Sequence, residues 1–270
     1  MSNAYHIVVC ASVVPDPLQT LEPVTGPAGP ALKNESMLPA ILDPWAAHAL
    51  YEGAHLAKQS PESKLWLLSL SPKAKLQQVM MTVAQKVPFE LVAVDGQCGG
   101  FVDAHQTAAA LAAAIRAIPG LDLTRLLLFG GWESAGRAAG VTLQLVGEEL
   151  GILDQFQGVD RLTPHDDGAF EVLERIEGAR HQVSRCAGAP AVLGWATGNL
   201  GEPRNDPQTG MRNMRTMMPA LQKAKAASIA NGTLAYTSVS LPKQQRTTRI
   251  EKDMTTDAIA QEIVQWVREE

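Results

Sequence analysis

Residues 64–70 read KLWLLSL and are followed at once by Ser71-Pro72, and this stretch decides the fold. A short, continuous apolar run is typical of a strand that is buried on both faces of a parallel sheet. Proline suits the first turn of a helix, so the sequence predicts a helix that begins at Ser71-Pro72 and continues to Lys86. Its apolar side chains recur at helical spacing, at Leu76, Val79, Met80 and Val83.

The same unit of a strand followed by a helix recurs on both sides of this stretch. Asp43-Pro44 and Asp103 are good helix starts, because an aspartate can cap the first free N–H groups of a helix. Alternating strands and helices predict an α/β fold with a doubly wound, mostly parallel sheet. The predicted strands are residues 5–14, 90–94 and 126–129, and the predicted helices are residues 44–57, 104–118 and 136–150.

The pattern changes after residue 150. Several short strands separated by turn signals predict a small antiparallel extension of the sheet. We expect an α/β domain over residues 1–227 and a C-terminal arm over residues 228–270, which docks on its own domain or on a second chain. The strands are predicted at residues 155–159, 170–177, 181–186 and 191–196, a short helix at 220–227, a polar extended tether at 233–250 and an amphipathic helix at 255–268.

Composition narrows the classes of function. The chain has 270 residues, of which 46% are hydrophobic and 19% charged, with a net charge of -5. This charge gives no indication of bulk binding to nucleic acid or to anionic membranes, and no apolar run approaches the ~20 residues of a membrane helix. Cys10, Cys98 and Cys186 are far apart and form no metal-ligand or disulfide pattern, so we expect a cytoplasmic protein.

Residues 198–219, GNLGEPRNDPQTGMRNMRTMMP, contain three prolines and three glycines, and we expect an irregular loop rather than a helix. The segment also carries four methionines and three arginines. Adaptable apolar side chains beside fixed positive charges suit a surface that docks on a partner. The alternative is that the methionines fold back on the core of their own domain, and composition alone does not decide between the two.

An anion site is predicted at the carboxyl ends of the parallel strands, where ligands bind in open α/β sheets. Its candidate walls are Ala11, Asp43 and Ser69, together with Gly130-Gly131 and residues 136–140, GRAAG. Glycines and a helix N-terminus offer N–H groups, and Arg137 adds a positive charge. The alternative is that these glycines only permit close packing of helix and sheet. The six histidines are scattered, so no catalytic residue is predicted.

Four stretches together resemble the β subunit of electron transfer flavoproteins. They are VVCASVVPD at residues 8–16, LDPWAAHALYEGAHLA at 42–57, SLSP at 69–72 and LGEPR at 200–204. The last is the most specific, because the family carries a Leu-x-Glu-Pro-Arg run after its last core strand. The resemblance extends over most of residues 5–227. It implies that the doubly wound sheet is of the Rossmann-like or adenine nucleotide α-hydrolase-like kind.

The resemblance implies an electron carrier subunit rather than an independent catalyst. Such a subunit pairs with an electron transfer flavoprotein α subunit, which holds most of the FAD, and takes electrons from a donor dehydrogenase. It implies partner-binding roles for Glu202, Pro203, Arg204, Met211 and Met214. It also implies that this chain buries AMP or a second FAD, at Ala11, Asp43, Ser69, Gly130, Gly131, Gly136, Arg137, Ala138 and Ala139.

The chain departs from the family at the nucleotide loop. Ala138-Ala139 replaces hydrogen-bonding side chains, and Asp43 stands in place of an asparagine, so its negative charge would repel a phosphate. An adenine nucleotide therefore stays an open hypothesis at this point. The alternative function is a stand-alone adenine-nucleotide-binding α/β domain, acting as a sensor or as a nucleotide-dependent enzyme.

Overall fold

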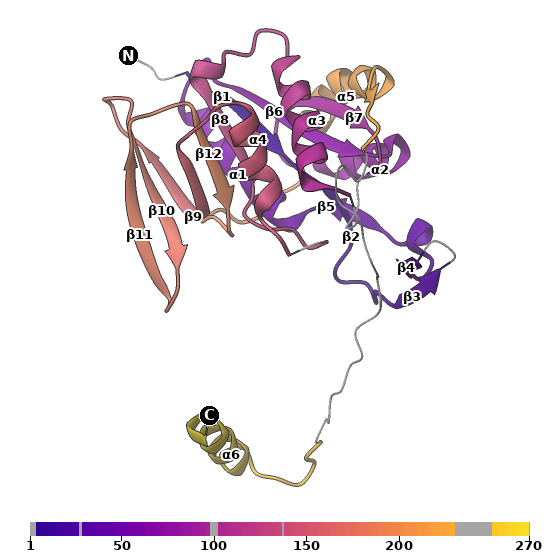
Figure 1. Ribbon diagram of the computed structural model, residues 1–270, viewed down its shortest axis with the longest axis vertical. Coiled ribbons are helices and arrows are strands. Elements are labelled where there is room, and N and C mark those ends of the chain that lie inside the picture. The colour runs from indigo at the N-terminus through magenta and orange to yellow at the C-terminus, as the bar shows by residue number, and fades with distance from the viewer. Residues whose placement is uncertain (1–3, 27–28, 98–101, 137, 230–249, 270) are drawn as a thin grey trace. The chain divides into compact units, whose positions relative to one another are not determined.

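The computed structural model describes residues 4–26, 29–97, 102–136, 138–229 and 250–269 (Figure 1). The chain divides into two compact units. The larger unit comprises Met1–Glu22 and Leu32–Thr237, and the smaller one comprises Pro23–Ala31 and Ser238–Glu270. Arg137, Cys98 and the predicted tether up to residue 249 lie outside the described residues.

The larger unit is built on a sheet whose described strands number nine, in the order β11-β10-β9-β12-β8-β1-β6-β7-β13. Pairing is parallel from β9 to β13 and antiparallel from β9 to β11. The predicted α/β class and its antiparallel extension are thus confirmed. The strands are β1 (His6–Cys10), β6 (Lys64–Ser71), β7 (Glu90–Asp95), β8 (Leu126–Gly131), β9 (Gln155–Pro164), β10 (Phe170–Ile176), β11 (Arg180–Cys186), β12 (Ala191–Trp195) and β13 (Lys225–Ala226).

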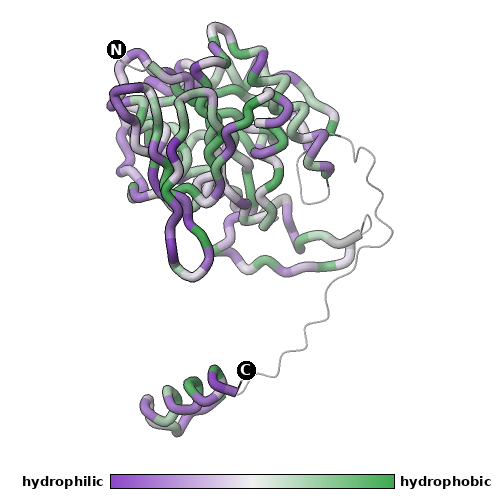
Figure 2. The backbone as a smooth tube through the Cα atoms, turned by 60° about the vertical axis from the view of Figure 1, so that its left-hand side comes forward, coloured by the Kyte–Doolittle hydropathy of each residue, from purple (hydrophilic) through white to green (hydrophobic). Residues whose placement is uncertain are grey.

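Helices cover both faces of this sheet. One face packs against α1 (Pro44–Gln59), α2 (Lys73–Val83) and α5 (Pro207–Gln222), and the other against α3 (Ala104–Arg116) and α4 (Val141–Glu149). Successive residues of a strand point to opposite faces, so Ile7 and Val9 join the first core while Val8 joins the second. Figure 2 shows hydrophobic segments throughout the body of the larger unit, whereas the projecting tip of the hairpin of β10 and β11 is largely hydrophilic.

The remaining described elements are short. The larger unit also contains β2 (Val13–Pro15), which pairs with β5 (Ala40–Leu42), and the 3-10 helices η1 (Glu35–Met37) and η2 (Leu123–Arg125). β3 (Pro23–Gly26) pairs with β4 (Gly29–Leu32). The smaller unit holds α6 (Thr256–Glu269), which begins next to the predicted start. None of the described helices is long and apolar enough to cross a membrane.

The helix starts follow from their capping residues. The side chain of Asp43 accepts a hydrogen bond from the Trp45 N–H at 3.1 Å, and that of Asp103 accepts one from His105 at 2.9 Å. Each aspartate thereby satisfies an N–H group that has no partner inside the helix. The helices predicted after Asp43 and Asp103 are confirmed.

Three predicted segments are wrong in detail. The apolar run from residue 5 is not one strand, because the chain leaves the main sheet after Cys10 and pairs with β5 instead. The helix predicted from Gly136 begins at Val141, since Ala138 has a left-handed φ of 50° that no helix accommodates. Residues 220–227 do not form a helix of their own, because α5 extends to Gln222 and β13 follows.

The largest error concerns residues 198–219, which contain most of α5 where we predicted an irregular loop. Asp206 caps the helix through bonds from Gln208 and Thr209, and Pro207 occupies the first turn, where its missing N–H costs nothing. Pro219 lies within the helix and removes one internal hydrogen bond close to its end. Burial of an apolar stripe that includes Met217 and Leu221 outweighs that loss.

Candidate functional site

The structure brings the predicted nucleotide residues to one edge of the sheet. β6, β1 and β8 are neighbours, and Cys10 is in register with Leu68 and with Gly130. Ala11, Ser69 and Gly131 therefore lie side by side at the carboxyl ends of these strands. Burial raises the pKa of the Cys10 thiol to about 12, so this cysteine stays protonated and is a poor nucleophile.

Two polar groups of this edge, the Ala11 N–H and the Asp43 carboxyl, already have partners within the protein. The Ala11 N–H donates to the Leu68 carbonyl at 2.9 Å. The buried Asp43 carboxyl accepts bonds from Trp45 and, at 2.9 Å, from the Ala135 N–H, so it ties α1 to the loop after β8. Burial raises the pKa of Asp43, although the bonds from these N–H groups oppose the shift.

The glycines of the same edge are needed for close packing. A Cβ on Gly131 would lie 2.7 Å from the Trp45 Cβ, and one on Gly130 would lie 3.1 Å from the Cys10 carbonyl oxygen. Both sites are therefore filled by the protein itself. Gly136, Ala138 and Ala139 lie in an exposed loop before α4.

The described residues of this edge do not fit an adenine nucleotide. Asp43 would place a carboxyl beside a phosphate, and the Ala11 N–H is already used. The Ser69 hydroxyl is buried without a hydrogen-bond partner among the described residues, and one hydroxyl does not make a phosphate cradle. AMP or a second FAD in this chain stays a prediction that this geometry does not support, and we derive no step through it.

A second place of interest is the outer surface of α5, where the predicted partner-binding residues lie. Met211 is 63% exposed, and Arg212 and Arg215 are exposed beside it. We call these three residues the α5 docking face. Met214, by contrast, is partly buried and packs against the core.

The segment before α5 is held on the end of α2. Lys86 forms an ion pair with Glu202 at 2.6 Å, and its ammonium donates to the Pro203 carbonyl at 3.4 Å. The Asp206 N–H donates to the Gln85 carbonyl at 2.8 Å. Arg204 is exposed. Glu202 and Pro203 thus have contacts within the chain, as Met214 does, whereas Arg204 remains accessible to solvent.

Asn213 fastens α5 itself to the core. Its side-chain N–H groups donate to the carbonyls of Ala84 and Val87, both at 2.8 Å, and its oxygen accepts from the Phe89 N–H at 3.3 Å. This side chain is buried and satisfies three backbone groups of the turn between α2 and β7. The α5 docking face is therefore presented on a rigid support.

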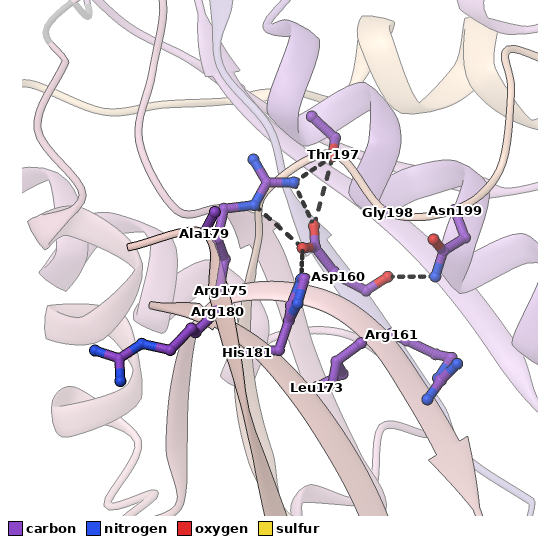
Figure 3. A pocket seen from close by; sticks show the side chains of 10 residues that line it. All are labelled: Asp160, Arg161, Leu173, Arg175, Ala179, Arg180, His181, Thr197, Gly198 and Asn199. Atoms are coloured by element: carbon purple, nitrogen blue, oxygen red, sulfur yellow. Dashed lines mark hydrogen bonds and ion pairs between the residues drawn. The ribbon is translucent and has the colours of Figure 1, made fainter. Parts of the chain in front are cut away.

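The third place is a cavity of about 500 Å³ beside β9, β10, β11 and the residues after β12 (Figure 3). Asp160 lines it and is the centre of a cluster of hydrogen bonds. Arg175 donates to both carboxylate oxygens, at 3.1 and 2.9 Å, and His181 contacts one of them at 3.0 Å. Arg175 also donates to the Thr197 hydroxyl at 2.9 Å. We call it the arginine cavity, lined among others by Asp160, Arg161, Arg175, Arg180, His181 and Thr197.

Two irregularities of β9 set the position of Asp160. Leu173 and Glu174 of β10 pair with Arg161 and Val159, so Asp160 has no partner residue on β10. Opposite β12 the pairing skips Gly158, whose φ is 68°. Such bulges change the direction of side chains. Here the Asp160 side chain contacts Arg175, His181 and Thr197.

Electrostatics keep Asp160 ionised. Burial by itself would raise its pKa, but the hydrogen bonds from His181 and Arg175 and the charge of Arg175 outweigh burial, so the pKa is lowered. A bidentate arginine–carboxylate pair is both strong and directional. Asp160 therefore holds the Arg175 and His181 side chains in fixed positions in the wall of the arginine cavity.

Sequence reasoning missed the arginine cavity. The turn predicted at residues 178–179 could have indicated part of it, because it places Arg175 opposite His181, as observed. The bulge that brings in Asp160 has no comparable sequence signal. Among the described residues, no group of three histidine, cysteine, aspartate or glutamate side chains could hold a metal ion.

Comparison with known proteins leaves the family of this chain unassigned. No protein-family model matches the sequence, and no curated protein matches it either.

Proposed function

We propose that this chain is a subunit of a heterodimeric electron transfer flavoprotein, which docks a flavin-bearing α subunit and a donor dehydrogenase. The observation that carries the proposal is the α5 docking face. An exposed methionine beside two exposed arginines, on a helix fixed to the core by Asn213, suits a protein partner with an acidic rim around an apolar pocket.

The roles of this chain are then binding and positioning. FAD held mainly by the α subunit supplies the electron transfer. Met211 supplies an apolar anchor, and Arg212 and Arg215 supply charges that steer and orient an acidic partner. The C-terminal arm adds a second contact with a partner chain. A cytoplasmic location belongs to the same proposal.

The first experiment is copurification of this chain with the product of a neighbouring gene that encodes a flavin-binding chain. We expect a yellow heterodimer that is reduced by its donor dehydrogenase. Met211→Asp should weaken donor-dependent reduction by at least about tenfold, because it places a charge where an apolar anchor is needed. Flavin content should not change, since the α subunit holds the FAD.

Met37 provides the matched control. It is 82% exposed and lies in η1, outside α5. Met37→Asp therefore makes the same chemical change away from the α5 docking face, and reduction should proceed at the wild-type rate. Equal rates for the wild type and Met211→Asp would contradict the proposal. Micromolar binding of AMP, ATP or FAD by the isolated chain, measured by calorimetry, would favour a stand-alone nucleotide-binding domain instead.

A further inference from the structure

The arginine cavity has a size and a charge that the proposed docking role does not use. It is an open depression of about 500 Å³, large enough to accommodate a small molecule. Three arginines line it, and Asp160 is the only carboxylate among its lining residues. Glu52 is the carboxylate bonded to its rim, where the N–H groups of Asn199 and Leu200 hold it at 2.9 and 3.3 Å.

Much of this positive charge has no ion-pair partner in the part of the chain that the structure describes. Among the described residues, Arg161 and Arg180 form no ion pair. Figure 3 shows their guanidinium groups on opposite flanks of the Asp160 cluster, joined to nothing drawn there. Arg175 uses two of its three nitrogens on Asp160 and Thr197. Its third nitrogen keeps two N–H donors for a ligand.

We propose that the arginine cavity binds a small molecule with at least two separated anionic groups, phosphate or carboxylate. Guanidinium groups recognise both through paired N–H donors. Arg161 and Arg180 stand on opposite flanks, so a ligand that spans the cavity engages both, whereas a single small ion engages one. Asp160 holds Arg175 in place and turns its unused nitrogen away from the carboxylate. This site is separate from the α5 docking face.

The test is calorimetry on the full chain at low ionic strength, with pyrophosphate, citrate and inorganic phosphate as probes. We expect pyrophosphate or citrate to bind, and inorganic phosphate to bind more weakly than either. Preference for pyrophosphate identifies phosphate as the ligand group, and preference for citrate identifies carboxylate. The double variant Arg161→Gln/Arg180→Gln should weaken binding by at least about tenfold, because it removes two charge-assisted contacts.

Arg185 offers the matched control on the same hairpin. It is exposed, pairs with Asp167 and does not line the arginine cavity. Arg185→Gln should change the affinity by less than about twofold, since a surface pair outside the site contributes little. Circular dichroism checks that each variant is folded. The proposal is overturned if neither pyrophosphate nor citrate binds at millimolar concentration, or if Arg185→Gln weakens binding as much as the double variant does.

Discussion

Asp160 links the folding of the antiparallel extension to the chemistry of the arginine cavity. It is a buried carboxylate on β9 whose oxygens meet Arg175 from β10 and His181 from β11. Its backbone carbonyl accepts a bond from the Asn199 side chain at 2.9 Å, so the residues after β12 are tied to it as well. One side chain and its own backbone thus connect three strands and a loop.

Asp160→Asn should lower the free energy of unfolding by about 1–3 kcal/mol at pH 7, because Arg175 and His181 lose a charged acceptor. The value is modest because Arg175 is 43% exposed and solvent screens its charge. The folded-state pKa of Asp160 is lowered, so its contribution is present above the unfolded pKa of about 3.9 and is lost as pH falls through the folded value.

Urea unfolding of both proteins between pH 7 and pH 3 measures this dependence. The difference between wild type and variant should shrink at the acidic end. Asp166→Asn is the control, because Asp166 is exposed and has no described hydrogen bond or ion pair. It should match the wild type within about 0.5 kcal/mol at every pH. A constant difference between wild type and Asp160→Asn from pH 7 to pH 3 would show that the charge of Asp160 is not what stabilises the fold.

For single residues, the sequence predicted contacts with close neighbours in the chain better than contacts with distant ones. The capping roles of Asp43 and Asp103 follow from neighbours two residues away. The bond from Ala135 to Asp43 and the bond from His181 to Asp160 join residues far apart in the chain. They depend on strand order and on a bulge, which a single sequence does not encode as a pattern.

Among the elements, α5 shows how packing overrides local propensity. Glycine and proline lower the helix propensity of its sequence, yet one face of the helix buries Asn213, Met217 and Leu221. Because the buried stripe includes the polar Asn213, the spacing of the apolar residues alone does not show the helical period. Strands β6, β7 and β8 were predictable because each contains a continuous apolar run. β6 and β8 are buried along almost their whole length, whereas β7 is only partly buried.

Asn213→Ala tests whether α5 is held as described. It leaves the carbonyls of Ala84 and Val87 and the N–H of Phe89 without their partner, in a buried place. Unsatisfied buried groups are costly, so we expect the free energy of unfolding to fall by about 2–4 kcal/mol. Chemical denaturation followed by circular dichroism measures it.

Thr216→Ala is the control on the same helix. Thr216 is exposed and its hydroxyl bonds only to the Asn213 carbonyl, one turn back, among the described contacts. A change of less than about 0.5 kcal/mol is expected. If both substitutions cost the same, the anchoring role assigned to Asn213 is wrong, and with it the rigid support of the α5 docking face.

At the scale of the whole chain, both apolar cores are built from one continuous part of the sequence. Every member of both cores lies between Tyr5 and Ile229. α6, in the smaller unit, has no buried residue but carries an apolar stripe, which includes Ile259, Ile263 and Trp266 (Figure 2). An amphipathic helix with an exposed apolar face suits burial against another surface.

Deletion of residues 238–270 should therefore weaken association with the partner without lowering the stability of the larger unit. It removes no member of either core, so the melting temperature of the larger unit should change by less than about 2 °C. In the proposed heterodimer the arm contacts the partner, so the same deletion should weaken association by at least about tenfold, measured by analytical ultracentrifugation.

In the full chain, Ile259→Glu with Ile263→Glu should weaken association similarly. The control is Gln261→Glu with Gln265→Glu, which adds the same charge at exposed polar positions and should leave association unchanged. Association that survives both the deletion and the isoleucine variants would assign partner binding to the larger unit alone.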